Sequence, residues 1–302
     1  MSRLVMRAAC VCELACACLV LASGAQAQQQ DVQVETIEVA PGLHMLVGRG
    51  GNVGVSVGED GVFLVDDQYA PLTEKILAAI RELSDQPVRF VINTHWHGDH
   101  TGGNENLGQA GAIIVAHDNV RKRLSTAQVL EVFDAEYPAR PKVALPVITF
   151  SEALTFHLNG YELHAFHVEN AHTDGDAIIV FRDANVVHMG DTYFNGRYPF
   201  IDVEHGGTID GMIAAANLVL GMVDDDTKII PGHGPLSNKV ELTAYRDMLV
   251  GVRERVLAEI ESGKTLDDAV AANPTAEFDA EWGHRFPPDV FTRLVYMDLS
   301  SR

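Results

Sequence analysis

The sequence contains little cysteine: four residues in 302, all within the first 18 positions. If that N-terminal stretch is removed, as the next paragraph argues, the remaining chain has none. Disulfide bonds, cysteine nucleophiles and thiolate metal sites are then excluded. The fold must depend on its apolar core, on bound metal, or on both.

The first 27 residues have the pattern of a cleaved secretion signal. Two arginines precede an almost wholly apolar run from Ala8 to Ala22, and Ala25-Gln26-Ala27 then supplies a small-x-small cleavage site. The run is short for a transmembrane span of about 20 residues and is interrupted by Glu13. We therefore expect residues 1–27 to be removed and the mature chain to be secreted into the periplasm, rather than held by an N-terminal anchor.

Positive charge is also scarce. The chain has 22 Lys and Arg against 42 Asp and Glu, a formal charge of −20, and without residues 1–27 the balance is 20 to 41, or −21. Such a surface repels polyphosphates, so neither a nucleic-acid partner nor a membrane partner is expected after signal cleavage. The hydrophobic content of 47% is that of an ordinary globular domain and excludes disorder.

Hydrophobic periodicity predicts a layered α/β domain. Strands are expected at 32–40, 43–47, 53–57, 62–65, 88–93, 113–116, 147–150, 153–158, 161–168, 177–181 and 186–189. Helices are expected at 71–83, from 118, at 207–220 and 239–262, and again in the tail from 265 to 302. The first four strands suggest an antiparallel meander, and a polar, proline-bearing segment follows the helix at 118. No repeat or long linker divides the chain, so residues 28–302 are expected to form a single domain with a helical C-terminal region.

Three histidines and an aspartate lie within six residues where the apolar strand 88–93 ends, in Thr94-His95-Trp96-His97-Gly98-Asp99-His100. In extended backbone, residues i and i+2 point to the same side, so His95 and His97 can bind one metal ion. A turn at Gly98 would direct Asp99 and His100 toward a second ion. Imidazole and carboxylate are the ligands that zinc prefers without thiolates. A tight surface turn is the alternative.

Further ligands are expected at the ends of later strands, where active sites of layered α/β folds usually lie. His172 precedes the strand at 177–181, Asp191 follows the strand at 186–189, and His233 follows Ile229-Ile230. Each has small or turn-forming neighbours that let the backbone approach an ion closely. The other eight histidines are assigned to ordinary surface or core positions.

This ordered set of residues resembles the metallo-β-lactamase superfamily of metallohydrolases. The resemblance spans about residues 53–234 and implies a four-layer αββα sandwich, in which two mixed sheets are flanked by helices and two zinc ions per chain lie at one edge of the sheets. Position by position, it implies that the first zinc is held by His95, His97 and His172, the second by Asp99, His100 and His233, and that Asp191 bridges both.

The chemistry that this resemblance implies is hydrolysis by a metal-bridging hydroxide that attacks an activated carbonyl. Two ions sharing a water make it acidic, since one zinc alone can lower the pKa of bound water to about 7. Asp99 is expected to be the catalytic carboxylate that orients the hydroxide. Asp66, at the end of the strand 62–65, is expected to order the ligand loop, with a simple strand-terminating turn as an equal alternative.

The expected substrate is a small molecule with a hydrolysable amide, ester or thioester. Secretion favours a β-lactam over a glutathione thioester, so a promiscuous β-lactamase is the leading hypothesis and a lactonase, thioesterase or other esterase the alternative. Asp191 stands where the commonest lactamase subclass has cysteine, and the lysine that would bind the drug carboxylate is missing. Arg197 is the candidate substitute.

Two interpretations of a different class stay open. The scaffold can carry iron for redox chemistry, or it can bind metal without turnover, although all seven ligand positions are filled. The glycine-rich stretch 48–52 is interpreted as a hairpin turn, with a mobile flap over the site as the alternative.

Overall fold

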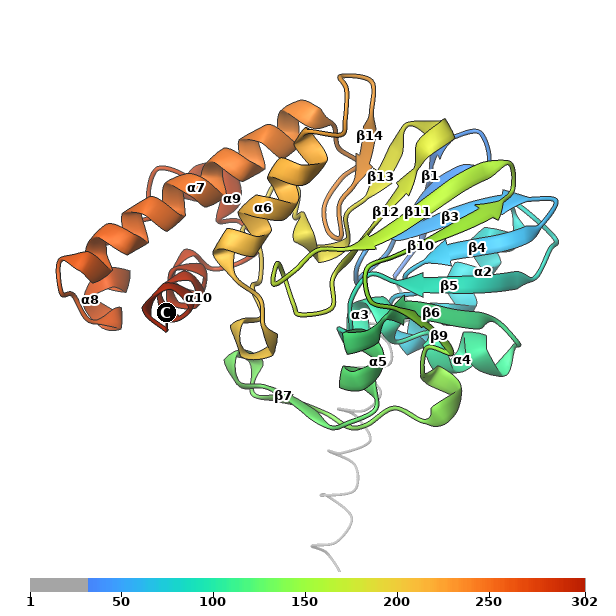
Figure 1. The fold of residues 1–302 in the computed structure, drawn as a ribbon, viewed down its shortest axis with the longest axis horizontal. Coiled ribbons are helices and arrows are strands. Elements are labelled where there is room, and N and C mark those ends of the chain that lie inside the picture. The colour runs from blue at the N-terminus through green and yellow to red at the C-terminus, as the bar shows by residue number, and fades with distance from the viewer. Residues whose placement is uncertain (1–31, 302) are drawn as a thin grey trace, which may run out of the picture.

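The fold is described from a computed structural model, which covers residues 32–301 (Figure 1). Within that range the strands form a seven-stranded sheet, a five-stranded sheet and a small two-stranded sheet. The expected secretion signal, residues 1–27, lies outside the described residues. Among the described helices, none is both long and apolar enough to cross a membrane.

The first sheet comes from the N-terminal half of the chain. Its strands, in spatial order, are β1 (Glu35–Ala40), β2 (Leu43–Val47), β3 (Val53–Gly58), β4 (Gly61–Val65), β5 (Val88–Asn93), β6 (Ile113–His117) and β9 (Ile148–Phe150). The antiparallel pairing of β1 to β4 confirms the predicted meander, whereas β4, β5, β6 and β9 pair in parallel. Parallel neighbours need crossover connections. These contain α2 (Thr73–Arg81), α3 (Gly98–Thr101), α4 (Asn104–Gln109) and α5 (Asp118–Leu124).

The second sheet and the long helices come from the C-terminal half. Its strands, in spatial order, are β10 (Ala153–Leu158), β11 (Tyr161–His167), β12 (Ala177–Phe181), β13 (Val186–His188) and β14 (Lys228–Ile230). The first four pair antiparallel, and β13 and β14 pair in parallel across α6 (Ile209–Leu220). The remaining helices are α7 (Lys239–Glu261), α8 (Leu266–Ala271), α9 (Asp279–Trp282) and α10 (Pro288–Ser300).

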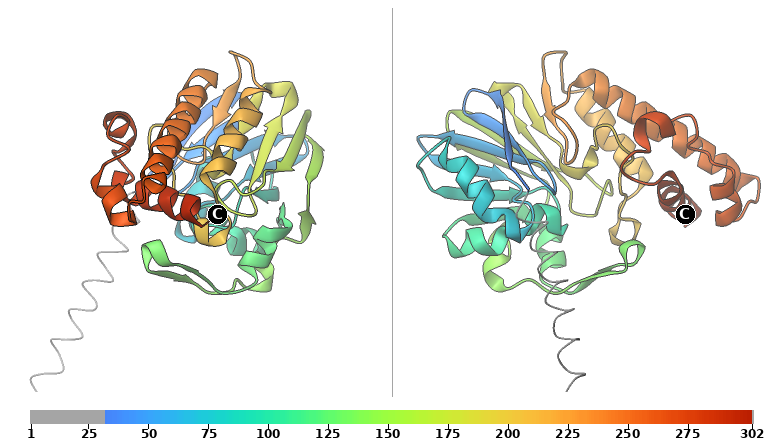
Figure 2. Two further views of the ribbon diagram at one scale, coloured as in Figure 1. Left: turned by 60° about the vertical axis from the view of Figure 1, so that its left-hand side comes forward. Right: turned by 180° about the vertical axis from the view of Figure 1, so that it is seen from behind.

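The two mixed sheets face each other between two layers of helices, as the family resemblance implies (Figures 1 and 2). Phe63 and Ile92 of the first sheet share a buried cluster with Ile179 of the second. Because side chains alternate along a strand, Leu64 points the other way and packs with Ile76 of α2. A third cluster joins the second sheet to α6, α7 and α10. Every residue of β4 is therefore buried, which explains its uninterrupted apolar sequence.

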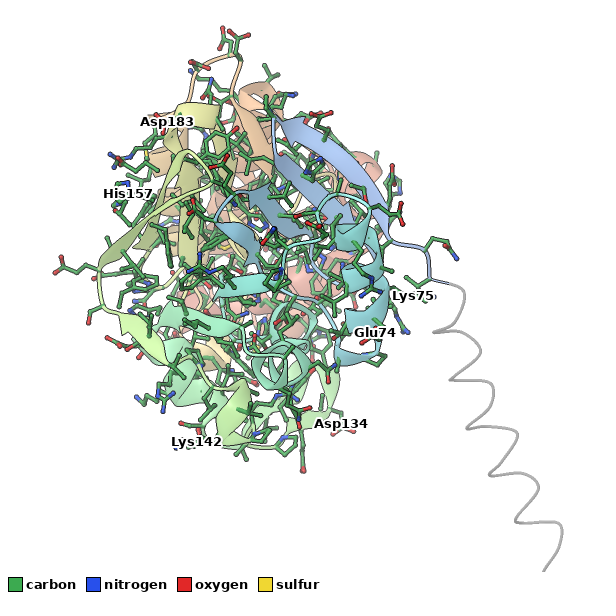
Figure 3. All side chains as sticks on the ribbon, turned by 90° about the vertical axis from the view of Figure 1, so that its right-hand side faces the viewer. Glu74, Lys75, Asp134, Lys142, His157 and Asp183 are labelled. Atoms are coloured by element: carbon green, nitrogen blue, oxygen red, sulfur yellow. The ribbon has the colours of Figure 1, made fainter. Side chains whose placement is uncertain are left out.

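The outer strand β10 shows the same alternation at the surface. Its residues are exposed and half-buried in turn, so Phe156 packs inward while His157 faces solvent (Figure 3). Periodicity located this strand correctly. It missed the hairpin of β7 (Gln128–Leu130) and β8 (Ala135–Tyr137), which lies within the region described as polar and proline-bearing. Strands of three residues are too short to show a period of two.

Candidate metal centre

The motif that contains His95 and His97 begins directly after β5 ends at Asn93. Thr94 is held by the side chain of Asp66, which accepts hydrogen bonds from the Thr94 backbone NH (2.7 Å) and hydroxyl (2.8 Å). His97 has extended backbone, and the helical turn α3 starts at the next residue. This change of conformation points Asp99 and His100 in a different direction from the two preceding histidines, as expected of a turn at Gly98.

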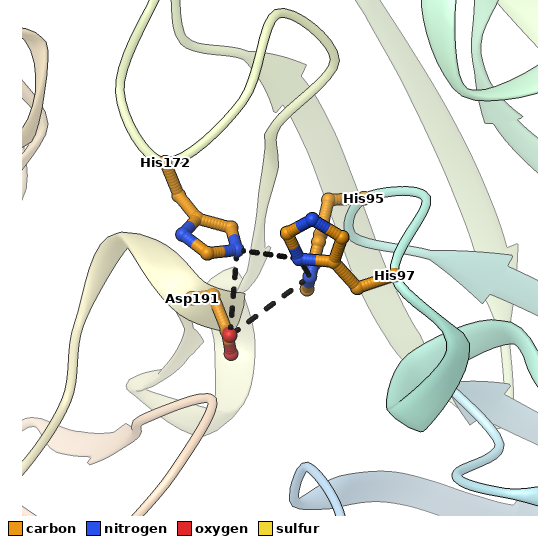
Figure 4. A group of neighbouring side chains, drawn as sticks. All are labelled: His95, His97, His172 and Asp191. Carbon is orange, nitrogen blue, oxygen red and sulfur yellow. Dashed lines mark hydrogen bonds and ion pairs between the residues drawn. The ribbon is translucent and has the colours of Figure 1, made fainter. Parts of the chain in front are cut away.

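A first group of potential ligands contains His95, His97, His172 and Asp191 (Figure 4). His97 Nδ1 lies 3.1 Å from His95 Nε2 and 2.9 Å from His172 Nε2. Asp191 Oδ2 lies 3.5 Å from His172 Nε2 and 3.9 Å from His95 Nε2. All four residues are buried, so these donor atoms converge on one point inside the protein.

A second group contains Asp99, His100 and His233. His233 Nε2 lies 3.2 Å from Asp99 Oδ2 and 3.4 Å from His100 Nε2. Asp191 is also close to this group, with Oδ1 3.0 Å from His100 Nε2 and Oδ2 3.3 Å from His233 Nε2. The carboxylate of Asp191 therefore lies between the two groups. The structure thus brings together all seven residues that the sequence suggested as ligands.

The donor set fits a pair of zinc ions. Tetrahedral zinc with Zn–N bonds of about 2.0 Å separates its nitrogen ligands by about 3.3 Å, close to the separations between the three imidazoles of the first group. Burial lowers the pKa of His95 well below its usual value and that of His172 to about 4, so both are neutral and can bind metal. Burial opposes ionisation of Asp191, but His233, His100 and His95 outweigh it and hold its pKa well below the usual range.

Glycines at two positions let the backbone approach this centre. A Cβ atom at position 51 would overlap the ring of His100, and one at 232 would overlap the carboxylate of Asp191. The loop that contains Gly51 is also fixed to its surroundings. Gly51 donates to the Asp99 carbonyl (3.1 Å) and Asn52 to the Gly232 carbonyl (2.7 Å). These bonds support the hairpin-turn interpretation of residues 48–52 over a mobile flap.

Buried acceptors face the outer nitrogens of the histidines. Asp66 Oδ2 lies 2.7 Å from His100 Nδ1, which is the position expected of a residue that orders the ligand loop. The Phe200 carbonyl lies 2.8 Å from His172 Nδ1. Such partners fix the tautomer, so that the opposite nitrogen offers its lone pair to metal. Asp176 accepts hydrogen bonds from the backbone NH groups of His172 (2.6 Å) and Thr173 (2.8 Å) and holds that loop.

Sequence reasoning missed Asp202. Its Oδ2 lies 2.9 Å from His97 Nε2, and its Oδ1 lies 2.7 Å from Nδ1 of His205, a histidine assigned to the ordinary ones. Burial opposes its ionisation, but its hydrogen bonds with His205 and His97 hold its pKa well below the usual range. Asp202 lies 105 residues away from His97, in the segment Asp202-Val203-Glu204-His205. An acid and a histidine stand beside it there, but nothing in this segment indicates that it contacts His97.

A pocket of about 410 Å³ opens beside the centre. His97, Asp99, Asp191 and His233 are among the residues that line it. Its walls are aromatic and cationic, and Arg197, the candidate carboxylate-binding residue, is among them. Two more arginines, Arg49 and Arg285, were not suggested by the sequence. The donors of the centre are therefore open to a small molecule.

An αββα fold that gathers histidines and aspartates at one edge of its two sheets defines a class of metal-dependent hydrolases. A family model described as the metallo-β-lactamase superfamily matches residues 46–234, and the chain belongs to this superfamily. The resemblance seen in the sequence is confirmed.

Curated relatives are distant. The chain is 28% identical over 177 residues to a hydroxyacylglutathione hydrolase from Polaromonas sp. This match covers 58% of this chain and 59% of the relative. A second hydroxyacylglutathione hydrolase, from Nitrosococcus oceani, is 25% identical over 71% of this chain and 73% of its own length. The lactamase-like protein aptB of Emericella nidulans is 25% identical, and the match spans about half of that protein.

Solved structures share the fold at low sequence identity. The inverting sec-alkylsulfatase Pisa1 from Pseudomonas sp. superposes with a TM-score of 0.65 and 17% identity, over 87% of this chain and 50% of that one. A metallo-β-lactamase from Pontibacter korlensis gives a TM-score of 0.59 and 18% identity, over 72% of this chain and 99% of that one. At these identities the likeness concerns the fold alone.

Proposed function

We propose that this protein is a dinuclear zinc hydrolase that cleaves an activated carbonyl compound, with a β-lactam as the first candidate substrate. The observation that carries the proposal is the position of Asp191, whose two carboxylate oxygens lie between two groups of ligands. A single ion would need one group only. His95, His97 and His172 would hold the first ion, Asp99, His100 and His233 the second, and Asp191 both.

Zinc at these positions supplies Lewis acidity toward water and toward the substrate carbonyl. The residues of the chain supply orientation and charge. Burial opposes ionisation of Asp99, but His100 and His233 outweigh it and hold the pKa of Asp99 well below its usual range. Asp99 also lines the pocket, with its side chain 20% exposed. It is therefore a carboxylate at neutral pH that can accept a hydrogen bond from attacking water and orient it.

A thioester is the second candidate substrate, because two of the relatives are hydroxyacylglutathione hydrolases. Export of the protein from the cytoplasm would favour a β-lactam over a thioester as the substrate. We propose that residues 1–27 direct the enzyme to the periplasm, where β-lactams arrive from outside the cell.

The test is hydrolysis of a chromogenic cephalosporin, a lactone and a thioester by zinc-loaded protein, each with and without chelator. Chelator-sensitive cephalosporin turnover that exceeds turnover of the other two supports the β-lactamase. Turnover of the lactone or thioester alone keeps the site chemistry and transfers the protein to the lactonases or thioesterases. Purified protein with near-stoichiometric iron and little zinc would overturn the proposal.

A further inference from the structure

His188 is a buried histidine outside the two groups of potential ligands. It is the last residue of β13, which pairs with β12 on one side and β14 on the other, and its side chain is fully enclosed. Burial lowers its pKa to about 4, so its ring is neutral at physiological pH. A neutral imidazole has one N–H donor and one acceptor nitrogen, and a buried imidazole needs a partner for each.

Both ring nitrogens of His188 have such a partner. The Gly190 backbone NH donates to Nδ1 (3.2 Å), so Nδ1 is the acceptor nitrogen of the ring. Nε2 then carries the proton and donates to the Asn52 carbonyl (3.2 Å). One tautomer satisfies both bonds, and His188 therefore joins the turn before Asp191 to the loop that contains Asn52.

These two bonds belong to a closed ring of four hydrogen bonds. The Asn52 NH donates to the Gly232 carbonyl (2.7 Å), and the Gly232 NH donates to the Gly190 carbonyl (2.7 Å). Gly190 donates to His188, and His188 donates back to Asn52, so each member donates to the next in the same direction. Hydrogen bonds arranged in this way polarise and strengthen one another. Three members contribute backbone groups, and only His188 contributes a side chain.

Two of the potential metal ligands are sequence neighbours of ring members. Gly190 precedes Asp191, whose carboxylate lies between the two groups of ligands, and Gly232 precedes His233 of the second group. The bond between the two glycines therefore joins the turn of Asp191 to the turn of His233. The three imidazoles of the first group have no sequence neighbour in the ring.

The loop of Asn52 connects the ring to the rest of the second group. The Asn52 side-chain amide donates to the carbonyls of Pro231 and Gly234, before and after His233, at 2.9 Å each. The residue that precedes Asn52 donates to the Asp99 carbonyl (3.1 Å). The ring is therefore bonded to the segments of both Asp99 and His233.

We infer that His188 is a positioning residue, which closes this ring and thereby holds the ligands of the second ion in place relative to those of the first. This inference rests on the proposed function, since it requires two ions. Without His188, the Gly190 NH and the Asn52 carbonyl lose their partners in a buried site, which is costly. The turns can then move apart, and the second ion loses its fixed ligand geometry while the first keeps its three imidazoles.

His188→Phe removes both bonds and keeps a planar ring. We expect the zinc affinity of the second site to fall about 10- to 100-fold, as is typical when a residue that orients metal ligands is removed, and the affinity of the first site to change less than about twofold. Competition with a coloured chelator, starting from metal-free protein, measures both affinities.

His117→Phe is the matched control. His117 is also buried at the end of a strand, β6, with Nδ1 accepting from the Asn119 NH (3.3 Å) and Nε2 facing the Ser151 carbonyl (3.2 Å). The control variant should lose stability without a change in either zinc affinity. Equal weakening of both sites in His188→Phe, or the same selective loss in His117→Phe, would overturn the inference.

Two more variants separate the bonds and serve if His188→Phe does not fold. His188→Asn retains an acceptor near the place of Nδ1, and His188→Gln retains a donor near the place of Nε2. Each should weaken the second site by about three- to tenfold, and unchanged second-site affinity in both would contradict the role of His188. In metal-free wild type, NMR of the ring nitrogens should show the Nε2–H tautomer, and the Nδ1–H tautomer would rule out the ring.

The outcomes distinguish this inference from the proposed function. A wild type that binds a single zinc would overturn the two-ion centre and this inference with it. Two zinc ions that bind His188→Phe as tightly as wild type would overturn the inference alone. If no substrate is hydrolysed but the second zinc still depends on His188, the proposed hydrolase fails and the positioning role stands.

Discussion

The metal centre and the pocket beside it are fixed in place by different means. Each donor of the centre sits at the end of a strand or at the start of a turn, and buried acceptors such as Asp66 and Asp202 face the outer nitrogens of the histidines. The cationic side of the pocket depends on fewer contacts. Arg285 is exposed, and its segment is joined to the Arg197 loop mainly through Tyr198 and Trp282.

This difference indicates which part of the molecule can change without loss of the other. The donors of the centre come from both sheets and must converge on one point. A substitution that displaces one donor therefore disrupts the geometry of the whole centre. A pocket wall on surface loops can be rebuilt while the centre stays intact. Substitutions in the centre should therefore affect metal, stability and turnover together, whereas substitutions in the wall should affect substrate binding and local stability without changing metal content or kcat.

The largest effect is expected for His95→Ala. The variant should lose metal from the first group and reduce turnover by several orders of magnitude. Metal that binds only the folded state at 1,000 times its Kd stabilises by about 4 kcal/mol, or about 10 °C in the thermal midpoint of a domain this size. Metal analysis and thermal unfolding with and without chelator provide the measurement. His157→Ala, at an exposed position, is the control, and a wild-type midpoint that ignores chelator would contradict the link between metal and folding.

Asp99→Asn should lower kcat by at least about a hundredfold, because the amide keeps the size of the side chain and removes the charge that orients water. Most metal of the first group should stay bound, since Asp99 belongs to the second. Steady-state kinetics beside metal analysis separates these effects. Unchanged turnover would remove Asp99 from the mechanism.

Asp202→Asn is expected to weaken metal binding about 10- to 100-fold, because His97 loses the carboxylate that fixes its ring. Competition with a coloured chelator measures this affinity. Asp174→Asn is the matched control, because the carboxylate of Asp174 pairs with Arg123 of α5 rather than with His97. Equal affinities in the two variants would show that Asp202 does not position His97.

Tyr198→Phe should have the smallest effect, and it tests most directly whether the pocket wall and the metal centre are independent. The loss of its bonds to Asp279 and Thr275 should cost about 1–2 kcal/mol of stability. KM for an anionic substrate should rise a few-fold while kcat and metal content stay unchanged. Tyr296→Phe, which removes a hydroxyl bonded to the Lys264 carbonyl away from the pocket, should leave KM as it is. A fall in metal content on Tyr198→Phe would mean that the wall and the centre are not independent.

Much of the fold could be predicted because its signals are local. The strands β3 to β6 and the helices α6 and α7 show their periods in consecutive residues, and Asn238 marks the start of α7, where its side chain accepts bonds from the first turn. The β7–β8 hairpin was missed because its strands are too short to show a period. The tail was expected to be helical and is, as the three separate helices α8, α9 and α10.

The sequence by itself identified the residues that the centre brings together. Four potential ligands in His95-x-His97-x-Asp99-His100 follow a buried strand, glycines stand beside Asp191 and His233, and the resemblance to the superfamily joined these positions into one predicted site. Only the tertiary structure decided what surrounds that site. Asp202 reaches His97 across 105 residues, and Arg285 reaches the pocket from the C-terminal segment. Such contacts arise from the packing of separate layers, and no periodicity or spacing along the chain encodes them.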